Sequence, residues 1–285
     1  MKILITGANG QLGQDMALGL CEQGEIFALS RNELDITNHD EVMEKVKAIQ
    51  PDIILHTAAY TNVDKAEEEK DLAFLVNAYG TKHVAMAAEQ VKAKLVYFST
   101  DYVFDGASSV LYQEFDQTNP INYYGKSKLA GERFVERYCK QSFIIRVSWL
   151  YGLYGKNFVK SIINQAKMKK PLRVIDDQIG SPTFTHDVVQ FLRELIITSH
   201  YGIYHVSNTG SCSWHEFATH IVDLLGFDVN VASMKSSALE QTRAAKRPHF
   251  STLDHQAIRL HGFSVPRHWK EGLQDFVQQY KAREG

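Results

Sequence analysis

Residues 2–16 read KILITGANGQLGQDM, and this stretch decides the fold. Its short apolar run at residues 3–5 predicts a buried strand, and a helical pattern follows the turn. The turn repeats glycine at every third position, at Gly7, Gly10 and Gly13. Glycine allows a tight turn and a close approach of the backbone to a pyrophosphate, whose charge a helix N-terminus attracts. The stretch therefore predicts a dinucleotide-binding turn, with a glycine-rich turn that holds no ligand as the alternative.

The remainder of the first half repeats this alternation of strand and helix. Such alternation indicates βαβ units and a parallel sheet covered on both faces, with ligands at the carboxyl ends of the strands. We therefore predict an α/β fold, a Rossmann-like doubly wound parallel sheet with a smaller C-terminal substrate-binding lobe. The division is residues 1–150 for the NAD(P)-binding domain and 151–285 mainly for the substrate lobe, with segments that return to the first sheet. Further strands are predicted at residues 25–30, 52–58, 94–100 and 142–148, and helices at 71–90, 124–138 and 213–226.

The composition excludes several classes of function. The 285 residues carry a formal net charge of −2 and show no dominant cluster of Lys or Arg, so a nucleic-acid partner is not expected. No apolar stretch approaches the ~18 residues that span a membrane, and the N-terminus does not resemble a signal peptide. Cys21, Cys139 and Cys212 are scattered, which is typical of free thiols in a reducing compartment. We expect a cytoplasmic protein.

The end of the second predicted strand bears on the choice of coenzyme. Arg31 stands there, and Asp35 follows four residues later. An acid at this place typically binds the ribose hydroxyls of NAD, whereas an Arg accommodates the 2′-phosphate of NADP. NADPH and NADH therefore both remain open, and Arg31 as a solvated surface residue is the alternative.

Residues 122–132, NYYGKSKLAGE, contain two tyrosines and two lysines at the start of a predicted helix. Side chains three or four positions apart share a helix face, which leaves Tyr124 with Lys128 or Tyr123 with Lys126. We predict that Tyr123 packs inward, that Lys126 faces water, and that Tyr124 and Lys128 border a cleft. The inward stripe would comprise Tyr123, Ser127, Ala130, Phe134 and Tyr138, and the outward stripe Lys126, Arg133, Arg137 and Lys140.

A Tyr beside a Lys can exchange a proton. The reference pKa of Tyr is about 10, and a neighbouring ammonium is expected to lower it. The pair could then protonate a carbonyl oxygen while hydride reaches the carbon. Thr100, in YFSTDYVFDG at the end of a central strand, places a hydroxyl where the same oxygen would develop charge. The alternative is an ordinary helix start, because an isolated Tyr-x-x-x-Lys is common.

Together these stretches resemble the extended short-chain dehydrogenase/reductases, and within them the dTDP-4-dehydrorhamnose reductases. The resemblance runs in order from Thr6 to Asp254. The matching stretches are TGANGQLG, HTAAYTNVDKAE, NAYGT, STDYVFDG, NYYGKSKLAGE, RVSWLYG, DDQIGSPT and RPHFSTLD.

The resemblance implies roles for individual residues in the reduction of a nucleotide-linked 4-keto-6-deoxysugar. Tyr124 would donate the proton, Lys128 would assist and bind the nicotinamide ribose, and Thr100 would polarise the C4 carbonyl. The other implied coenzyme contacts are Gly10, Gln11 and Leu12 at the pyrophosphate, Asp35 and Ile36 at the adenosine, and Ala58, Ala59 and Tyr60 beside the coenzyme. The implied substrate contacts are Thr61, Val63, Thr100, Asp101 and Trp149 at the deoxysugar and Arg247 at the diphosphate, for which a surface salt bridge is the alternative.

Some members of this family form homodimers through acidic residues that hold Mg²⁺. Asp15 could supply one such acid, but His186 stands where another is expected. Mg²⁺ therefore has little support, and monomer and homodimer both remain open.

Three other functions share these features. A 4,6-dehydratase is disfavoured because Tyr102 replaces the carboxylate expected two positions after Thr100. A sugar-nucleotide epimerase remains a rival. A non-catalytic regulatory subunit that binds NADP is disfavoured by the complete set of Thr100, Tyr124 and Lys128.

Overall fold

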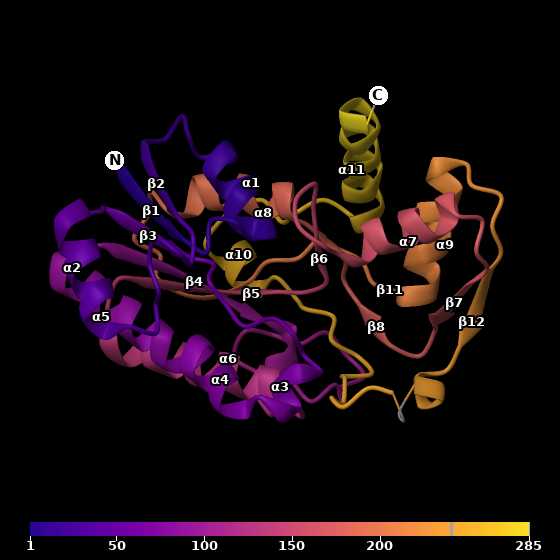
Figure 1. Cartoon of the computed structure of the whole chain (residues 1–285), viewed down its shortest axis with the longest axis horizontal. Helices are drawn as coiled ribbons and strands as arrows, with labels where there is room; N and C mark the ends of the chain where they lie inside the picture. The colour runs from indigo at the N-terminus through magenta and orange to yellow at the C-terminus, as the bar shows by residue number, and fades with distance from the viewer. Residues whose placement is uncertain (240–241, 285) are drawn as a thin grey trace.

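The core of the molecule is a parallel sheet of six strands in the order β10-β5-β4-β3-β1-β2 (Figure 1). The computed structural model describes residues 1–239 and 242–284. Its strands are β1 (Lys2–Thr6), β2 (Glu25–Leu29), β3 (Ile53–His56), β4 (Lys94–Thr100), β5 (Ser142–Val147), β6 (Leu150–Tyr151), β7 (Leu172–Ile175), β8 (Ile179–Gly180), β9 (Thr183–Phe184), β10 (Gly202–His205), β11 (Cys212–Ser213) and β12 (Val231–Met234).

Helices surround the sheet and build the smaller lobe. The α-helices are α1 (Gln11–Gly19), α2 (His39–Ile49), α3 (Lys65–Glu68), α4 (Lys70–Phe74), α5 (Thr81–Val91), α6 (Tyr123–Tyr138), α7 (Phe158–Lys167), α8 (Thr185–Leu195), α9 (Trp214–Leu225), α10 (Gln256–Leu260) and α11 (Trp269–Glu284). A π-helical turn, η1, spans Leu75–Gly80, and 3₁₀ turns are η2 (Asp101–Val103) and η3 (Ser236–Leu239).

Both faces of the sheet are covered, as predicted for a doubly wound fold. Alternate residues of β1 point to opposite faces. Ile3 and Ile5 belong to the core that packs against α1 and α8, whereas Leu4 belongs to the core under α2, α5 and α6. The central strands therefore read as continuous apolar runs, because neither face meets water.

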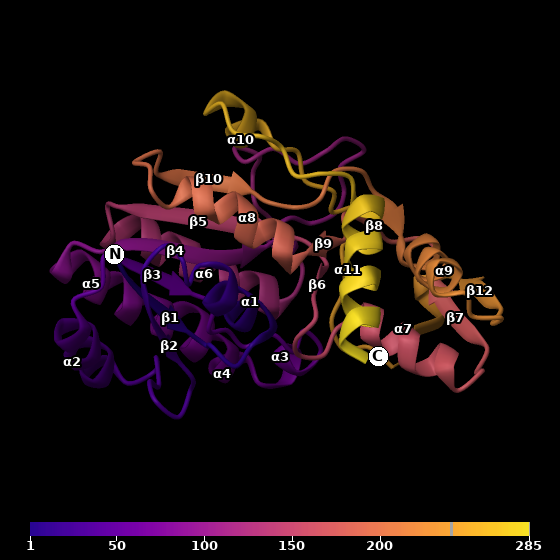
Figure 2. The ribbon, with the colours of Figure 1, turned by 90° about the horizontal axis from the view of Figure 1, so that it is seen from above.

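The second half of the chain divides between the sheet and a separate lobe. Strand β10 pairs in parallel with β5, and α8 packs against α1, so both extend the layers of the first half. The lobe consists of α7, α9 and α11 with the pairs β7–β12, β8–β11 and β6–β9, and it has its own apolar core. Figure 2 shows α11 between the sheet and the outer part of this lobe.

The helix predicted at residues 71–90 is interrupted. It consists of α4, the π-helical turn η1 and α5. The π-helical turn contains Asn77, which is fully buried and makes side-chain hydrogen bonds to the backbone of Tyr60 and to the Ser127 hydroxyl. The π-helical turn therefore contains the residue whose side-chain hydrogen bonds connect η1, the loop after β3 and helix α6.

The predicted faces of α6 are partly wrong. Tyr123 is half-buried, and the ammonium groups of Lys70 and Lys126 lie 4.3 and 4.8 Å from its ring centre. The face with Lys128, Gly131 and Val135 is the buried one. The reason is close packing: a Cβ on Gly131 would lie 2.3 Å from the Tyr97 hydroxyl and 2.4 Å from the Asn77 carbonyl. A glycine here lets α6 lie directly on its neighbours.

Candidate active site

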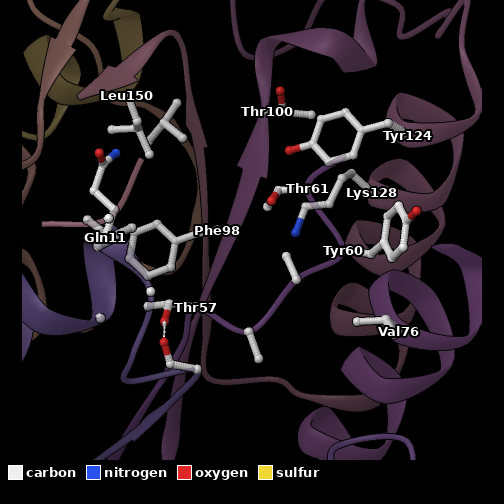
Figure 3. A pocket seen from close by; sticks show the side chains of 18 of the residues that line it. Gln11, Thr57, Tyr60, Thr61, Val76, Phe98, Thr100, Tyr124, Lys128 and Leu150 are labelled. Atoms are coloured by element: carbon white, nitrogen blue, oxygen red, sulfur yellow. Dashed lines mark hydrogen bonds between the residues drawn. The ribbon is translucent and has the colours of Figure 1, made fainter. Parts of the chain in front are cut away.

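A cavity of about 1110 Å³ opens at the carboxyl ends of the central strands. Loops after β1, β2, β3 and β4 line it together with α6 and the smaller lobe (Figure 3). Its volume exceeds that of the usual pocket for one drug-sized ligand, which is about 300–1,000 Å³. The predicted site residues that line it are Gly7, Gly10, Gln11, Leu12, Gly13, Arg31, Asp35, Ile36, Ala58, Ala59, Tyr60, Thr61, Val63, Thr100, Asp101, Tyr124, Lys128 and Trp149.

One end of the cavity, here called the phosphate end, is the glycine turn and the start of α1. Gly7 has a left-handed backbone with φ of +68°, and a Cβ there would meet the Ala58 backbone at 2.6 Å. A Cβ on Gly13 would lie 2.6 Å from the Gly7 carbonyl. The first turn of α1 has no acidic residue, and its cap, Gly10, has no side chain. The free N–H groups of this turn therefore suit a pyrophosphate.

Arg31 and Asp35 line the cavity beyond the second strand. The Asp35 carboxylate accepts bonds from the Thr37 N–H at 2.9 Å and the Thr37 hydroxyl at 2.8 Å, and these bonds lower the Asp35 pKa. Arg31 is exposed at the cavity rim. The Asp35 carboxylate is thus hydrogen-bonded within its own loop, whereas the Arg31 guanidinium is exposed at the cavity rim and can contact an anion.

The other end, here called the reaction end, contains Thr100, Tyr124 and Lys128. Figure 3 shows the Tyr124 hydroxyl and the Lys128 ammonium directed into the same space, with Thr100 beside the tyrosine. The Thr100 hydroxyl is close enough to the Tyr124 hydroxyl to lower the pKa of the tyrosine. The Lys128 Nζ lies 4.2 Å from the ring centre of Tyr97. Tyr123, the rival tyrosine, does not line the cavity.

Burial dominates the electrostatics of the reaction end. Desolvation raises the pKa of Tyr124 to about 12, against a smaller lowering by the Thr100 bond. Desolvation also lowers the pKa of Lys128 to about 7, against a smaller raising by Glu132. The expectation of a lowered Tyr124 pKa is therefore wrong, because the effect of burial exceeds any stabilisation of the phenolate by its neighbours. A tyrosine that stays protonated near neutral pH is better suited to the role of proton donor than to that of base.

Behind Lys128 lies a buried ion pair. Glu132 and Arg146 are each at most 3% exposed, and their charged groups meet at 2.8 and 3.0 Å. The bidentate geometry satisfies both groups where water is absent. Glu132 follows Lys128 by one helical turn, so this pair also supplies the carboxylate that supports the lysine's charge.

The smaller lobe closes the cavity with aromatic side chains that the sequence did not reveal. Trp214, the first residue of α9, stacks on Trp149 with ring centres 3.4 Å apart and planes at 8°. Phe158 packs on Trp214 at 4.5 Å. The only sequence signal was the amphipathic pattern of α9, which does not indicate where the first residue of the helix will point. Other lining residues that the prediction missed include Asn9, Thr57, Phe98, Tyr102, Leu150 and Lys156.

Two predicted residues are placed differently from the rest. Arg247 does not line the cavity; its guanidinium makes two bonds to Asp64, at 2.6 and 3.0 Å, which is the alternative weighed from the sequence. Asp15 is hydrogen-bonded to the Thr185 hydroxyl, and desolvation raises its pKa. Among the described residues, no group of at least three His, Cys, Asp or Glu side chains is arranged to hold a metal ion. Within the same residues, no helix is long and apolar enough to cross a membrane.

Known proteins resemble this chain in sequence and in fold along nearly its whole length. The Bacillus subtilis spore coat polysaccharide biosynthesis protein SpsK is 42% identical over 98% of this chain and 97% of its own. The dTDP-4-dehydrorhamnose reductase of Aggregatibacter actinomycetemcomitans is 39% identical over 96% of this chain and 97% of its own.

A solved structure agrees closely. The dTDP-4-dehydrorhamnose reductase of Bacillus anthracis, crystallised in complex with NADP, has 48% identity and a TM-score of 0.95, and the match covers 98% of this chain and 99% of that one. The family model described as the RmlD substrate binding domain matches residues 1–282. The chain therefore belongs to the RmlD family, within the fold of the NAD(P)-dependent short-chain dehydrogenase/reductases.

Proposed function

We propose that the chain is an NAD(P)H-dependent oxidoreductase that reduces the C4 keto group of dTDP-4-dehydro-L-rhamnose to give dTDP-L-rhamnose. The observation that carries this proposal is the convergence of Thr100, Tyr124 and Lys128 in the cavity that also contains the glycine turn. Full-length relatives that bear the name dTDP-4-dehydrorhamnose reductase support the choice of substrate.

The reaction adds a hydride to C4 and a proton to O4. A bound nicotinamide supplies the hydride. Tyr124 donates its phenolic proton to O4, which breaks the tyrosine O–H bond and forms the product hydroxyl. The Lys128 ammonium stabilises the phenolate left behind. The Thr100 hydroxyl donates a hydrogen bond to the same oxygen while negative charge develops on it.

The residues at the phosphate end fit a nicotinamide dinucleotide. The space that a Cβ would fill at Gly7 and Gly13 lets the backbone come close to a pyrophosphate. Arg31 lies at the rim of the cavity and would contact a ribose 2′-phosphate, so we propose NADPH as the preferred coenzyme and NADH as the second. The NADP found in the Bacillus anthracis relative supports this order.

The two parts of the chain would divide the ligands between them. Residues 1–150 would hold the coenzyme, and residues 151–285 would mainly close over the sugar nucleotide, with Trp149 and Trp214 as the aromatic wall. Arg247 would reach the substrate diphosphate only if it left Asp64. The free state of Cys21, Cys139 and Cys212 supports a cytoplasmic location.

The test follows the absorbance of NADPH and of NADH after dTDP-4-dehydro-L-rhamnose is added to the purified protein, and identifies the product by NMR. We expect one coenzyme oxidised for each keto group reduced. An epimerase would yield an isomer without net oxidation, and a regulatory subunit would bind NADP without turnover. Protein that binds nucleotide and oxidises neither coenzyme would contradict the proposal.

A further inference from the structure

The Thr100 hydroxyl makes a hydrogen bond that conflicts with its proposed role as a donor to the substrate carbonyl. It donates to Asp101 Oδ1 at 3.0 Å and accepts from the Tyr102 N–H at 3.2 Å. A hydroxyl has a single proton to donate. While Asp101 accepts that proton, Thr100 has none for the substrate oxygen, although stabilisation of that oxygen is what the site requires of it.

Asp101 is built into the site. It begins η2 directly after β4, is 2% exposed and lines the cavity. Its Oδ2 has no hydrogen-bond partner among the described residues, although the nearby Ser251 hydroxyl lowers the pKa of the carboxyl group. Burial with no cation from the described residues beside it makes this carboxylate costly to ionise, although hydroxyl and backbone donors offset part of that cost.

We propose that Asp101 acts in its neutral form as a positioning residue: its Oδ1–H donates to Thr100 Oγ1, and the Thr100 hydroxyl is thereby released to donate to the substrate carbonyl. The two states differ by one proton. In the ionised state the proton between the two oxygens belongs to Thr100 and points at Asp101. In the neutral state it belongs to Asp101, and the Thr100 proton points into the cavity. The inference rests on the proposed reductase function and adds the control of its carbonyl contact.

The surroundings favour the neutral form below about pH 6. Burial raises the Asp101 pKa to about 6, against smaller lowering by hydrogen bonds from Ser251, from Thr100 and from the backbone of Asp101 and Tyr102. The titratable groups next to it are Tyr102 on η2 and Tyr124 on α6, and desolvation raises the pKa of both. Both tyrosines are therefore neutral in the working range and offer no charge to hold a carboxylate.

In the part of the chain that the structure describes, no cation is among the groups that shift the Asp101 pKa. Arg243 and Arg247 influence the neighbouring Tyr102 instead. Lys128 is the other cavity residue with a pKa near neutrality, at about 7. Its titration affects the same measurements, so the experiment must separate the two groups.

The test compares kcat against pH for the wild type, Asp101→Asn and Asp101→Ala. The neutral fraction of Asp101 falls as the pH rises through about 6, so wild-type kcat should fall there. Asparagine keeps the shape of the side chain and donates through its amide at every pH. Asp101→Asn should therefore lose this part of the pH profile while it keeps the fall near pH 7 that belongs to Lys128. Asp101→Ala should lose about 10²-fold in kcat at all pH values, as does the removal of one carbonyl donor.

A double variant tests whether the effect passes through Thr100. If it does, Asp101→Ala should change kcat little in a Thr100→Val background. A role in sugar binding alone would instead raise KM in both backgrounds. Wild-type kcat that rises through about pH 6, or Asp101→Asn as impaired as Asp101→Ala, would overturn the proposal. Absence of NADPH oxidation by the wild type at every pH would overturn the reductase function itself, which is a different result.

Discussion

The two ends of the cavity use different chemistry. The phosphate end consists of backbone: glycines at Gly7, Gly10 and Gly13 and the N–H groups that open α1. The reaction end consists of side chains at Thr100, Tyr124 and Lys128, and burial shifts the pKa values of the last two. Binding at the phosphate end therefore depends on backbone shape, which does not change with pH, whereas the chemistry depends on desolvated ionisable groups, whose protonation does change with pH.

The largest expected effect separates reaction from binding. Tyr124→Phe removes the proton donor and should lower kcat by about 10²–10⁴-fold, the usual contribution of a general acid. The KD for NADPH should change little, because the phosphate end is untouched. Tyr123→Phe is the matched control on the same helix and lies outside the cavity. Steady-state kinetics and fluorescence titration measure the two quantities; a larger loss in the control would reverse the assignment.

A change at the phosphate end should have the opposite signature. Gly7→Ala forces a Cβ onto the Ala58 backbone at 2.6 Å and into a left-handed conformation that costs about 1–2 kcal/mol. We expect the KD for NADPH to rise by at least about tenfold, which is 1.4 kcal/mol. Gly226→Ala is the control: it has φ of +71° but nothing within 4 Å. If both variants unfold equally in a thermal melt and bind NADPH alike, close packing at Gly7 has no part in binding.

The third prediction concerns pH at the reaction end. The pKa of Lys128 is lowered to about 7, so the charged form falls as the pH rises through that value. Plots of kcat/KM report the free enzyme and should decline there, and the KD for NADPH should follow the same titration only weakly. Lys128→Arg keeps its charge and should abolish the decline at a reduced maximum. A decline near pH 7 that persists in that variant would belong to a group other than Lys128.

The smallest effect should appear at the coenzyme's far end. Arg31→Ala removes an exposed cation from the rim of the cavity and should raise KM for NADPH by roughly tenfold, since a hydrogen bond to a charged group contributes about 1.5 kcal/mol or more. KM for NADH should stay nearly constant because NADH lacks the 2′-phosphate. Equal effects on both coenzymes would place Arg31 elsewhere than at the 2′-phosphate.

The helix α6 shows where prediction from the sequence succeeds and where it stops. Spacing left two Tyr–Lys pairs, and the distribution of apolar and charged side chains around the helix selected Tyr124 with Lys128, which both line the cavity. The same distribution assigned Tyr123 to the core, whereas it packs beneath two lysine ammonium groups. Apolar periodicity assigns buried positions to hydrophobic side chains, so it did not reveal that Glu132 would be buried. The burial of this carboxylate depends on an ion pair with Arg146 on β5, a residue of another element.

Local patterns were sufficient for the strands β1 to β5, the glycine turn and the Tyr–Lys pair, because each depends on residues that are close in the chain. Contacts between distant segments were not accessible in this way. Trp214 reaches Trp149 only because the start of α9 meets the segment that follows β5, and Arg247 pairs with Asp64 although the two residues are 183 positions apart. The proton affinities of Asp101, Tyr124 and Lys128 also follow from burial, which exists only once the chain has folded. The sequence by itself thus determines which reactive groups the site contains, whereas tertiary packing determines how deeply they are buried and hence their pKa values.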